Sequence, residues 1–259
     1  IDNLRKYHSQ LKDSNVAIKG CSIHSVQEAI EAAELGASYI TAGHIYSTDC
    51  KRGVPPRGLE FLKAVCENVN IEEDFIRYAL DYEEKARIDY EEDDNTILFI
   101  IDVPVIEVES GNKVYSTMPI GIIFVRDDYF ITVSLTDNYI IQELEKKKNV
   151  ITYKKSRLLL QIFYSNSERF LSLLKRLNKE TEVAEGVLKN SMKNKELLKL
   201  LSLKKSLVYF TTSLKSNEVV MEKTLRGNLI KLYEEDEDIL DDAIIENKQA
   251  IEMSRIYSD

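Results

Sequence analysis

The final 140 residues of the chain contain no proline, and this absence constrains the fold more than any other feature. Proline interrupts a helix interior, so a long stretch without it permits long helices. From residue 156 onward, apolar side chains recur every three or four positions, with Gly186 and Gly227 as the internal breaks. Such helices are typical of a bundle or an oligomeric stalk. We expect helices over residues 156–177, 181–192, 196–214 and 219–257.

A strongly apolar, β-branched segment over residues 96–109 predicts a buried strand ahead of these helices. Turn residues at 110–113 and 126–128 indicate two hairpins. The first joins this strand to one at 114–119, and the second joins strands at 120–125 and 129–134. Together with a short strand at 87–90, they predict a mainly antiparallel sheet of about four or five strands. We expect flanking helices at residues 71–80 and 138–148.

The first 70 residues show a different pattern, in which strands and helices alternate. Short apolar runs at 16–18 and 38–42 predict two buried strands. Ser25 and Glu28 form a capping box for a helix that ends at Gly36. This alternation is typical of parallel α/β units, whose functional side chains gather after the carboxyl ends of the strands. Further helices are expected at residues 2–11 and 59–68.

Composition changes sharply near residue 70. All three cysteines and all three histidines lie before it, where 8 basic side chains balance 8 acidic ones. After it, 27 basic side chains face 36 acidic ones, and this difference gives the whole net charge of −9. The sequence runs through the boundary without a linker, which predicts a fusion of two unrelated parts. The second part divides into an α+β region at 71–150 and a helical bundle with stalk at 151–259.

Several classes of protein are disfavoured by composition. The negative charge argues against a nucleic-acid partner, which favours a basic surface. No segment approaches the roughly 18 consecutive apolar residues of a membrane helix. Cysteines without pairing motifs indicate a reducing compartment.

Two N-terminal segments, GCSIHSVQEA and GASYITAGHIYSTDCKRGVPPRGLEFL, resemble the TenI and thiamine-phosphate synthase superfamily of TIM barrels. The resemblance places His24 at the proton-transfer histidine of the tautomerase, and Thr48 and Lys51 in the phosphate-binding loop. Cys50 replaces the second threonine of the synthase loop, which favours the TenI branch. The matched segment amounts to about two strands and three helices of an eight-strand barrel. The resemblance implies a barrel fragment over residues 1–70 and, as an alternative function, a thiazole tautomerase or a related enzyme of thiamine metabolism.

The segments EEDFIRYALDYEEKARIDYEEDD, ILFIIDVPVIE, LLSLKKSLVYFTTSLKSNEVVMEKTLR and YEEDEDILDDAIIENKQAIEMSRIYSD resemble the cytosolic domain of CorA-type magnesium transporters. The resemblance spans residues 71–259. It implies a homopentameric channel for Mg²⁺, often permissive to Co²⁺, whose cytosolic part senses Mg²⁺ between protomers. The pore helices and the family's Gly-Met-Asn signature are absent, so we expect a regulatory part at the cytoplasmic side of the membrane, joined to it by helices that this chain lacks. It is expected to be no enzyme, and a hybrid with neither activity is a further alternative.

The acidic start of the last predicted helix is the candidate sensor. Eight of the thirteen residues from 234 to 246 are acidic. Magnesium keeps several water ligands and binds one or two carboxylates, so clustered acids suit weak hydrated binding. The alternative is an acidic face that keeps the stalk in solution. The candidate ligands are Asp238, Asp241, Asp242 and Glu246.

The predicted fold is therefore α+β: an α/β barrel fragment, then a mainly antiparallel sheet packed with helices, then a long stalk helix. Open strand edges favour pairing. We accordingly expect the strands around Val16 and Ile40 to add to the sheet of the second part.

Overall fold

The computed structural model describes residues 20–23, 25–35, 39–42, 58–69, 71–109, 112–126, 129–136, 138–147, 150, 154–190 and 194–258. Its main sheet is antiparallel, with the strands in the order β3-β4-β5-β6. The strands are β3 (Arg87–Glu91), β4 (Thr96–Glu109), β5 (Asn112–Val125) and β6 (Tyr129–Ser134). The mixed α+β fold and the mainly antiparallel sheet are thus confirmed.

Strand β5 is one continuous strand where the sequence predicted two. It pairs with β4 along its whole length, from Thr96 opposite Val125 to Glu109 opposite Asn112. Pro119 cannot donate a ladder hydrogen bond, which explains the expected break there. However, β6 pairs only with residues 120–125 of β5, so no strand pairs with the outer edge of β5 at Pro119 in the described structure.

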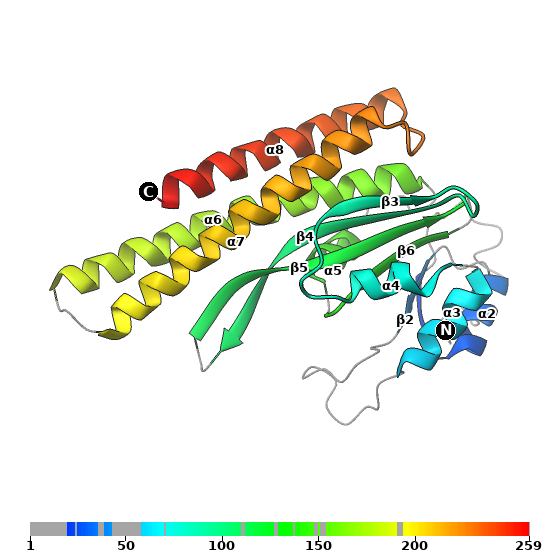
Figure 1. Ribbon diagram of the computed structural model, residues 1–259, viewed down its shortest axis with the longest axis horizontal. Coiled ribbons are helices and arrows are strands. Elements are labelled where there is room, and N and C mark those ends of the chain that lie inside the picture. Colours follow the sequence, from blue (N-terminus) through cyan, green and yellow to red (C-terminus); the bar gives the residue numbers. More distant parts are fainter. Residues whose placement is uncertain are drawn as a thin grey trace.

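The alternation of side chains along β4 builds two cores on opposite faces of the sheet. Ile97, Phe99 and Ile101 pack against the helices that come after the sheet. Leu98 and Ile100 pack on the other face, under α4 (Glu73–Ala79). Figure 1 shows α4 on one side of the sheet and three long helices on the other. These are α6 (Lys155–Asn190), α7 (Asn194–Arg226) and α8 (Glu234–Ser258), with the shorter α5 (Tyr139–Lys146) beside them.

The two glycines of the helical region have different effects. Helix α6 continues through Gly186 and through residues 178–180, so the predicted break at this glycine and the predicted division between 156–177 and 181–192 were both wrong. A solvent-exposed glycine costs a helix only about 1 kcal/mol, which the rest of a 36-residue helix offsets. At Gly227, by contrast, α7 ends: its N–H bonds the Lys223 carbonyl, and Asn228 adopts a left-handed φ of 48°. The single helix predicted over 219–257 is therefore the end of α7, a turn and α8.

The N-terminal part has a separate sheet. Strands β1 (Gly20–Ile23) and β2 (Tyr39–Ala42) pair in parallel, and α2 (Val26–Glu34) and α3 (Gly58–Val69) accompany them. The expected cap is confirmed, because the Ser25 hydroxyl accepts a hydrogen bond from the Glu28 N–H at 3.2 Å. The strand predicted at 16–18 lies outside the described residues.

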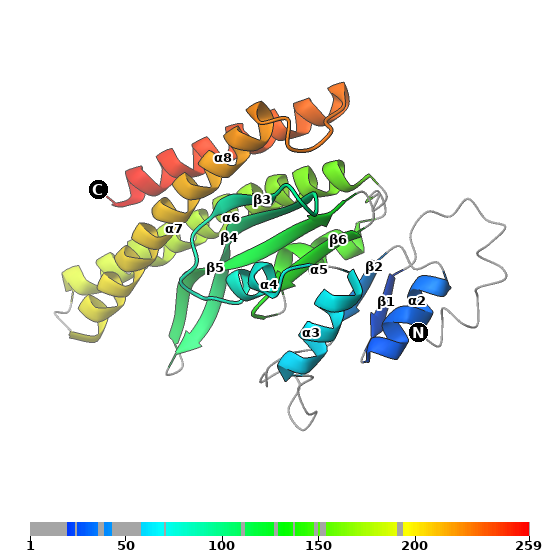
Figure 2. The same cartoon turned by 45° about the vertical axis from the view of Figure 1, so that its right-hand side comes forward.

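The expectation that the strand around Ile40 would extend the main sheet was wrong, since β2 pairs with β1 in a separate two-stranded sheet. For the strand around Val16, which lies outside the described residues, the expectation stays a prediction. Helix α3 links the two parts of the chain. It leads almost directly into α4, which lies on a face of the main sheet, and Figure 2 shows α2, β1 and β2 grouped beside α3 as a separate unit.

Helix α3 also joins the two cores. Its Phe61 packs with Ile23 and Ala32 of the N-terminal part. One turn and a half later, Cys66 packs into the core under α4, and its carbonyl accepts a hydrogen bond from the Ile71 N–H at 3.0 Å. A helix that contributes to both cores explains why the boundary needs no linker.

Candidate functional site

The acidic start of α8 is divided by the fold into a buried part and an exposed part. Asp236 is only 1% exposed, and its carboxylate binds the Arg157 guanidinium of α6 at 2.7 Å. Glu235 binds the same guanidinium at 2.7 Å from the solvent side. Asp236 also accepts a hydrogen bond from the Tyr233 N–H at 3.4 Å, in the turn before the helix. Arg157 and Asp236 therefore fix where α8 begins, and this acid is not available to a cation.

The predicted metal ligands lie on the remaining surface. Asp238, Asp241 and Asp242 are exposed, and Glu246 is half-buried. At 100° per residue, positions 238, 242 and 246 succeed one another along one side of the helix, and 241 lies beside them. The structure thus brings the four predicted residues onto one continuous solvent-facing surface of α8.

Two residues of α6 belong to the same acidic surface and were not predicted. The pKa of Tyr164 is raised above its ordinary value, first by the Glu168 carboxylate, then by burial, and then by Glu246 and Asp242. The Tyr164 hydroxyl therefore senses carboxylates from both α6 and α8. Because Glu168 lies 66 residues before the acid run, only the packing of α6 against α8 could reveal it.

A single copy of the chain does not assemble these acids into a metal centre. Among the described residues, no three His, Cys, Asp or Glu side chains are placed to hold one ion. A hydrated Mg²⁺ needs only one or two carboxylates. The surface therefore suits a cation that keeps its water ligands and contacts the carboxylates through them.

The same side of α8 continues toward its end as a partly apolar stripe. Ile245 and Ile256 are 59% and 69% exposed, and the exposed Gln249 and Glu252 lie between them. The spacing of four, three and four residues is that of the seam of a coiled coil. Exposed isoleucines at this spacing indicate a surface for another helix.

A second polar site holds α6 and α7 to the sheet. At Asp102, β4 has passed the end of β3, which pairs only as far as Ile100. The Asp102 N–H donates to the Asn217 amide oxygen at 2.9 Å, and its carbonyl accepts from the Asn166 and Asn217 amides at 2.9 and 2.8 Å. Two asparagines thus replace the missing strand. Burial raises the pKa of the Asp102 carboxyl, and a hydrogen bond with Ser213 opposes this shift.

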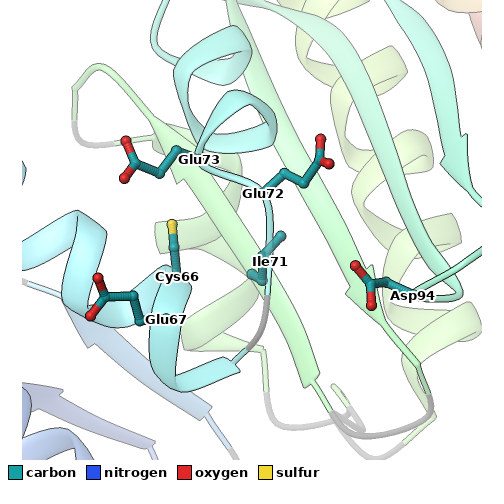
Figure 3. A pocket seen from close by; sticks show the side chains of 6 residues that line it. All are labelled: Cys66, Glu67, Ile71, Glu72, Glu73 and Asp94. Carbon is teal, nitrogen blue, oxygen red and sulfur yellow. The ribbon is translucent and has the colours of Figure 1, made fainter.

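An acidic hollow of about 290 Å³ lies at the boundary between the two parts, lined by Cys66, Glu67, Ile71, Glu72, Glu73 and Asp94. Figure 3 shows Glu72 pointing away from Glu67 and Glu73, so the acids do not converge on one point. Burial, and secondly the Glu73 carboxylate, raise the pKa of the Cys66 thiol. A more firmly protonated thiol is a weak nucleophile and a weak ligand.

The residues predicted from the barrel resemblance, His24, Thr48 and Lys51, lie outside the described residues. Their roles therefore stay predictions.

Two family models match the chain, and their ranges overlap. The model of the CorA-like Mg²⁺ transporter protein matches residues 59–259, and that of thiamine monophosphate synthase matches residues 9–75. The shared residues 59–75 are α3 and the start of α4, the elements that contribute to both cores. Within the described residues, the chain has no helix with the length and apolar character of a membrane span.

The curated relatives divide in the same way. The cobalt/magnesium transport protein CorA of Methanocaldococcus jannaschii is 27% identical over 204 residues, covering 76% of this chain and 62% of its own length. The thiamine-phosphate synthase of Pyrococcus furiosus is 41% identical over 54 residues, which cover 21% of this chain and 26% of that enzyme. The chain therefore spans less than two thirds of the CorA relative and about a quarter of the synthase.

Solved structures support the larger match. The soluble domain of CorA from M. jannaschii superposes with a TM-score of 0.68 at 24% identity, covering 78% of this chain and 80% of that domain. The complete CorA magnesium transporter of the same organism gives 0.66 at 25% identity, covering 77% of this chain and 62% of the transporter. With a family match over 59–259, the chain belongs to the CorA-like Mg²⁺ transporter family.

Proposed function

We propose that residues 71–259 form the divalent-cation-sensing, regulatory part of a CorA-like magnesium and cobalt transporter at the cytoplasmic side of the membrane. The observation that carries this proposal is the exposed surface of α8, where acids at the start of the helix continue into an apolar stripe. One part of this surface suits association with other copies, and the other suits a cation.

Self-association is favoured by the stripe that includes Ile245 and Ile256. Burying both isoleucines between neighbouring helices would remove a large apolar area from water. Copies of α8 packed side by side, in a homopentamer as the family resemblance implies, would also bring their acidic ends together. Several acidic surfaces at close range repel one another.

Cation sensing depends on that repulsion. A hydrated Mg²⁺ between neighbouring copies would contact Asp238, Asp241, Asp242 or Glu246 through its water ligands and offset the repulsion. Co²⁺ would act in the same way. The binding is expected to be weak, because the described residues of a single copy contain no group of three ligands placed around one ion.

Sedimentation velocity of the full chain, with and without about 5 mM Mg²⁺, tests the proposal because weak hydrated sites need millimolar cation. We expect Mg²⁺ to shift the chain from monomer toward pentamer. A variant that neutralises the four acids (Asp238→Asn, Asp241→Asn, Asp242→Asn, Glu246→Gln) should lose this dependence on Mg²⁺.

The matched control neutralises four exposed acids elsewhere: Glu34→Gln, Glu60→Gln, Glu83→Gln and Glu185→Gln. It changes the net charge by the same amount and should respond to Mg²⁺ as the native chain does. A native chain that is indifferent to Mg²⁺, or equal responses of the two variants, would refute the proposed sensor.

No enzymatic activity is proposed. The CorA relatives are named as transport proteins, and the thiamine-phosphate synthase match covers only 26% of that enzyme. A barrel site depends on loops from several strands, and two described strands supply few of them.

A further inference from the structure

The far end of the α6–α7 hairpin has a charge opposite to that of the rest of the chain. Residues 183–190 and 194–205, which we name the hairpin tip, contain five lysines and two glutamates, a net charge of +3 in a chain of net charge −9. Lys189, Lys195 and Lys199 are exposed there. These lysines give the far end of the hairpin a local excess of positive charge that is exposed to solvent.

The hairpin tip also exposes large apolar side chains. Leu197, Leu198 and Leu201 are 47%, 66% and 56% exposed, and Val183 on α6 is 57% exposed. Single exposed leucines are ordinary, but several within two turns of one helix form a patch that marks an interaction site. Lysines interleaved with exposed leucines on a helix are the pattern of a segment that lies on an anionic lipid surface.

The hairpin tip projects past the end of α8. The Lys204 ammonium contacts the Ser258 carbonyl at 3.3 Å, and Thr211 and Ser254 share a hydrogen bond of 2.6 Å, so the two helices are antiparallel with known register. The first ten residues of α7 therefore extend about 15 Å beyond the end of α8. Figure 1 shows the carboxyl end of α8 and the hairpin tip at the same end of the molecule.

A second copy of the chain is the competing occupant, since its α8 is acidic. Those acids, however, lie at the start of α8. If neighbouring α8 helices run in the same direction, Glu246 is about 25 Å along the axis from Lys199. The acidic start of a neighbouring α8 would therefore lie too far away to pair with Lys199, while a surface of anionic lipid at that end would be close to it.

We propose that the hairpin tip binds an anionic bilayer surface, with its lysines on lipid headgroups and Leu198 and Leu201 at the headgroup boundary. Near such a surface each lysine strengthens binding about fivefold, so removing two should weaken it about 25-fold. This inference does not depend on cation sensing.

Vesicle flotation of the full chain provides the test. We expect binding to vesicles of phosphatidylcholine and phosphatidylglycerol (roughly 3:1), reduced binding at high salt, and little binding to phosphatidylcholine alone. The variants Lys195→Gln/Lys199→Gln and Leu198→Gln/Leu201→Gln should each lose most of the binding. The controls Lys215→Gln/Lys223→Gln and Val208→Gln/Val219→Gln change exposed lysines and exposed aliphatic residues elsewhere on the same helix and should bind as the native chain does.

Absence of binding to anionic vesicles, or equal loss in tip and control variants, would overturn the proposal. Sedimentation velocity without vesicles distinguishes the competing occupant. If the tip variants reduce self-association there, the hairpin tip is a contact between copies and the lipid assignment is wrong. If Mg²⁺ does not change self-association but the chain still binds anionic vesicles, the proposed sensor is refuted and this inference is left intact.

Discussion

Replacing Arg157 by Met should destabilise the attachment of α8 more than any nearby change of surface charge. The Asp236 side chain is 1% exposed, and the substitution removes the guanidinium that binds its carboxylate at 2.7 Å. Removing one partner of a buried pair costs about 3–5 kcal/mol. Here the Tyr233 N–H and the amino end of α8 still favour the carboxylate, which reduces the expected cost to about 2–3 kcal/mol.

Thermal unfolding monitored by circular dichroism measures this effect. For a chain of this size, the loss corresponds to a lower Tm by about 4–12 °C. Glu235→Gln removes the exposed partner of the same guanidinium and should change Tm little. Adding Asp236→Asn to Arg157→Met removes the buried charge and should recover part of the loss. If Arg157→Met cost no more than Glu235→Gln, or if the second change lowered Tm further, the pair would not be what holds α8 in place.

Three further changes test the packing of the sheet and helices, each by its urea midpoint. Because burial raises the pKa of Asp102, the folded state holds this proton more tightly than the unfolded state, so stability falls as the pH rises above about 4. Asp102→Asn should therefore be more stable than the native chain at about pH 7.5, and the difference in the free energy of unfolding should vanish below about pH 4. An equal difference at both pH values would contradict this. A methyl group at Gly121 would clash with the Ala79 side chain of α4, so Gly121→Ala should cost about 1–3 kcal/mol, partly recovered by Ala79→Gly. Gly186→Ala meets open space inside α6 and should stabilise by about 1 kcal/mol; a loss would show that the helix needs this glycine.

Local patterns in the sequence predicted most of the elements. The β-branched run at 96–109 gave β4 with its observed limits, and Ser25 and Glu28 gave the start of α2. These signals lie within a few residues of the structure that they specify. A glycine is more ambiguous: Gly186 and Gly227 look alike in sequence, yet only the second ends a helix, because an unstrained interior position tolerates a missing side chain.

From the sequence alone we could predict two parts, a sheet followed by long helices in the second part, and an acidic start of the last helix. Only the tertiary structure decided that Asp236 is bound to Arg157 while Asp238, Asp241 and Asp242 face solvent. It also decided that α3 contributes to both cores, and that Asn166 and Asn217 replace a strand beside Asp102. The physical reason is that these contacts join residues up to 115 positions apart or depend on which side of a helix is covered, and neither fact is encoded in local spacing.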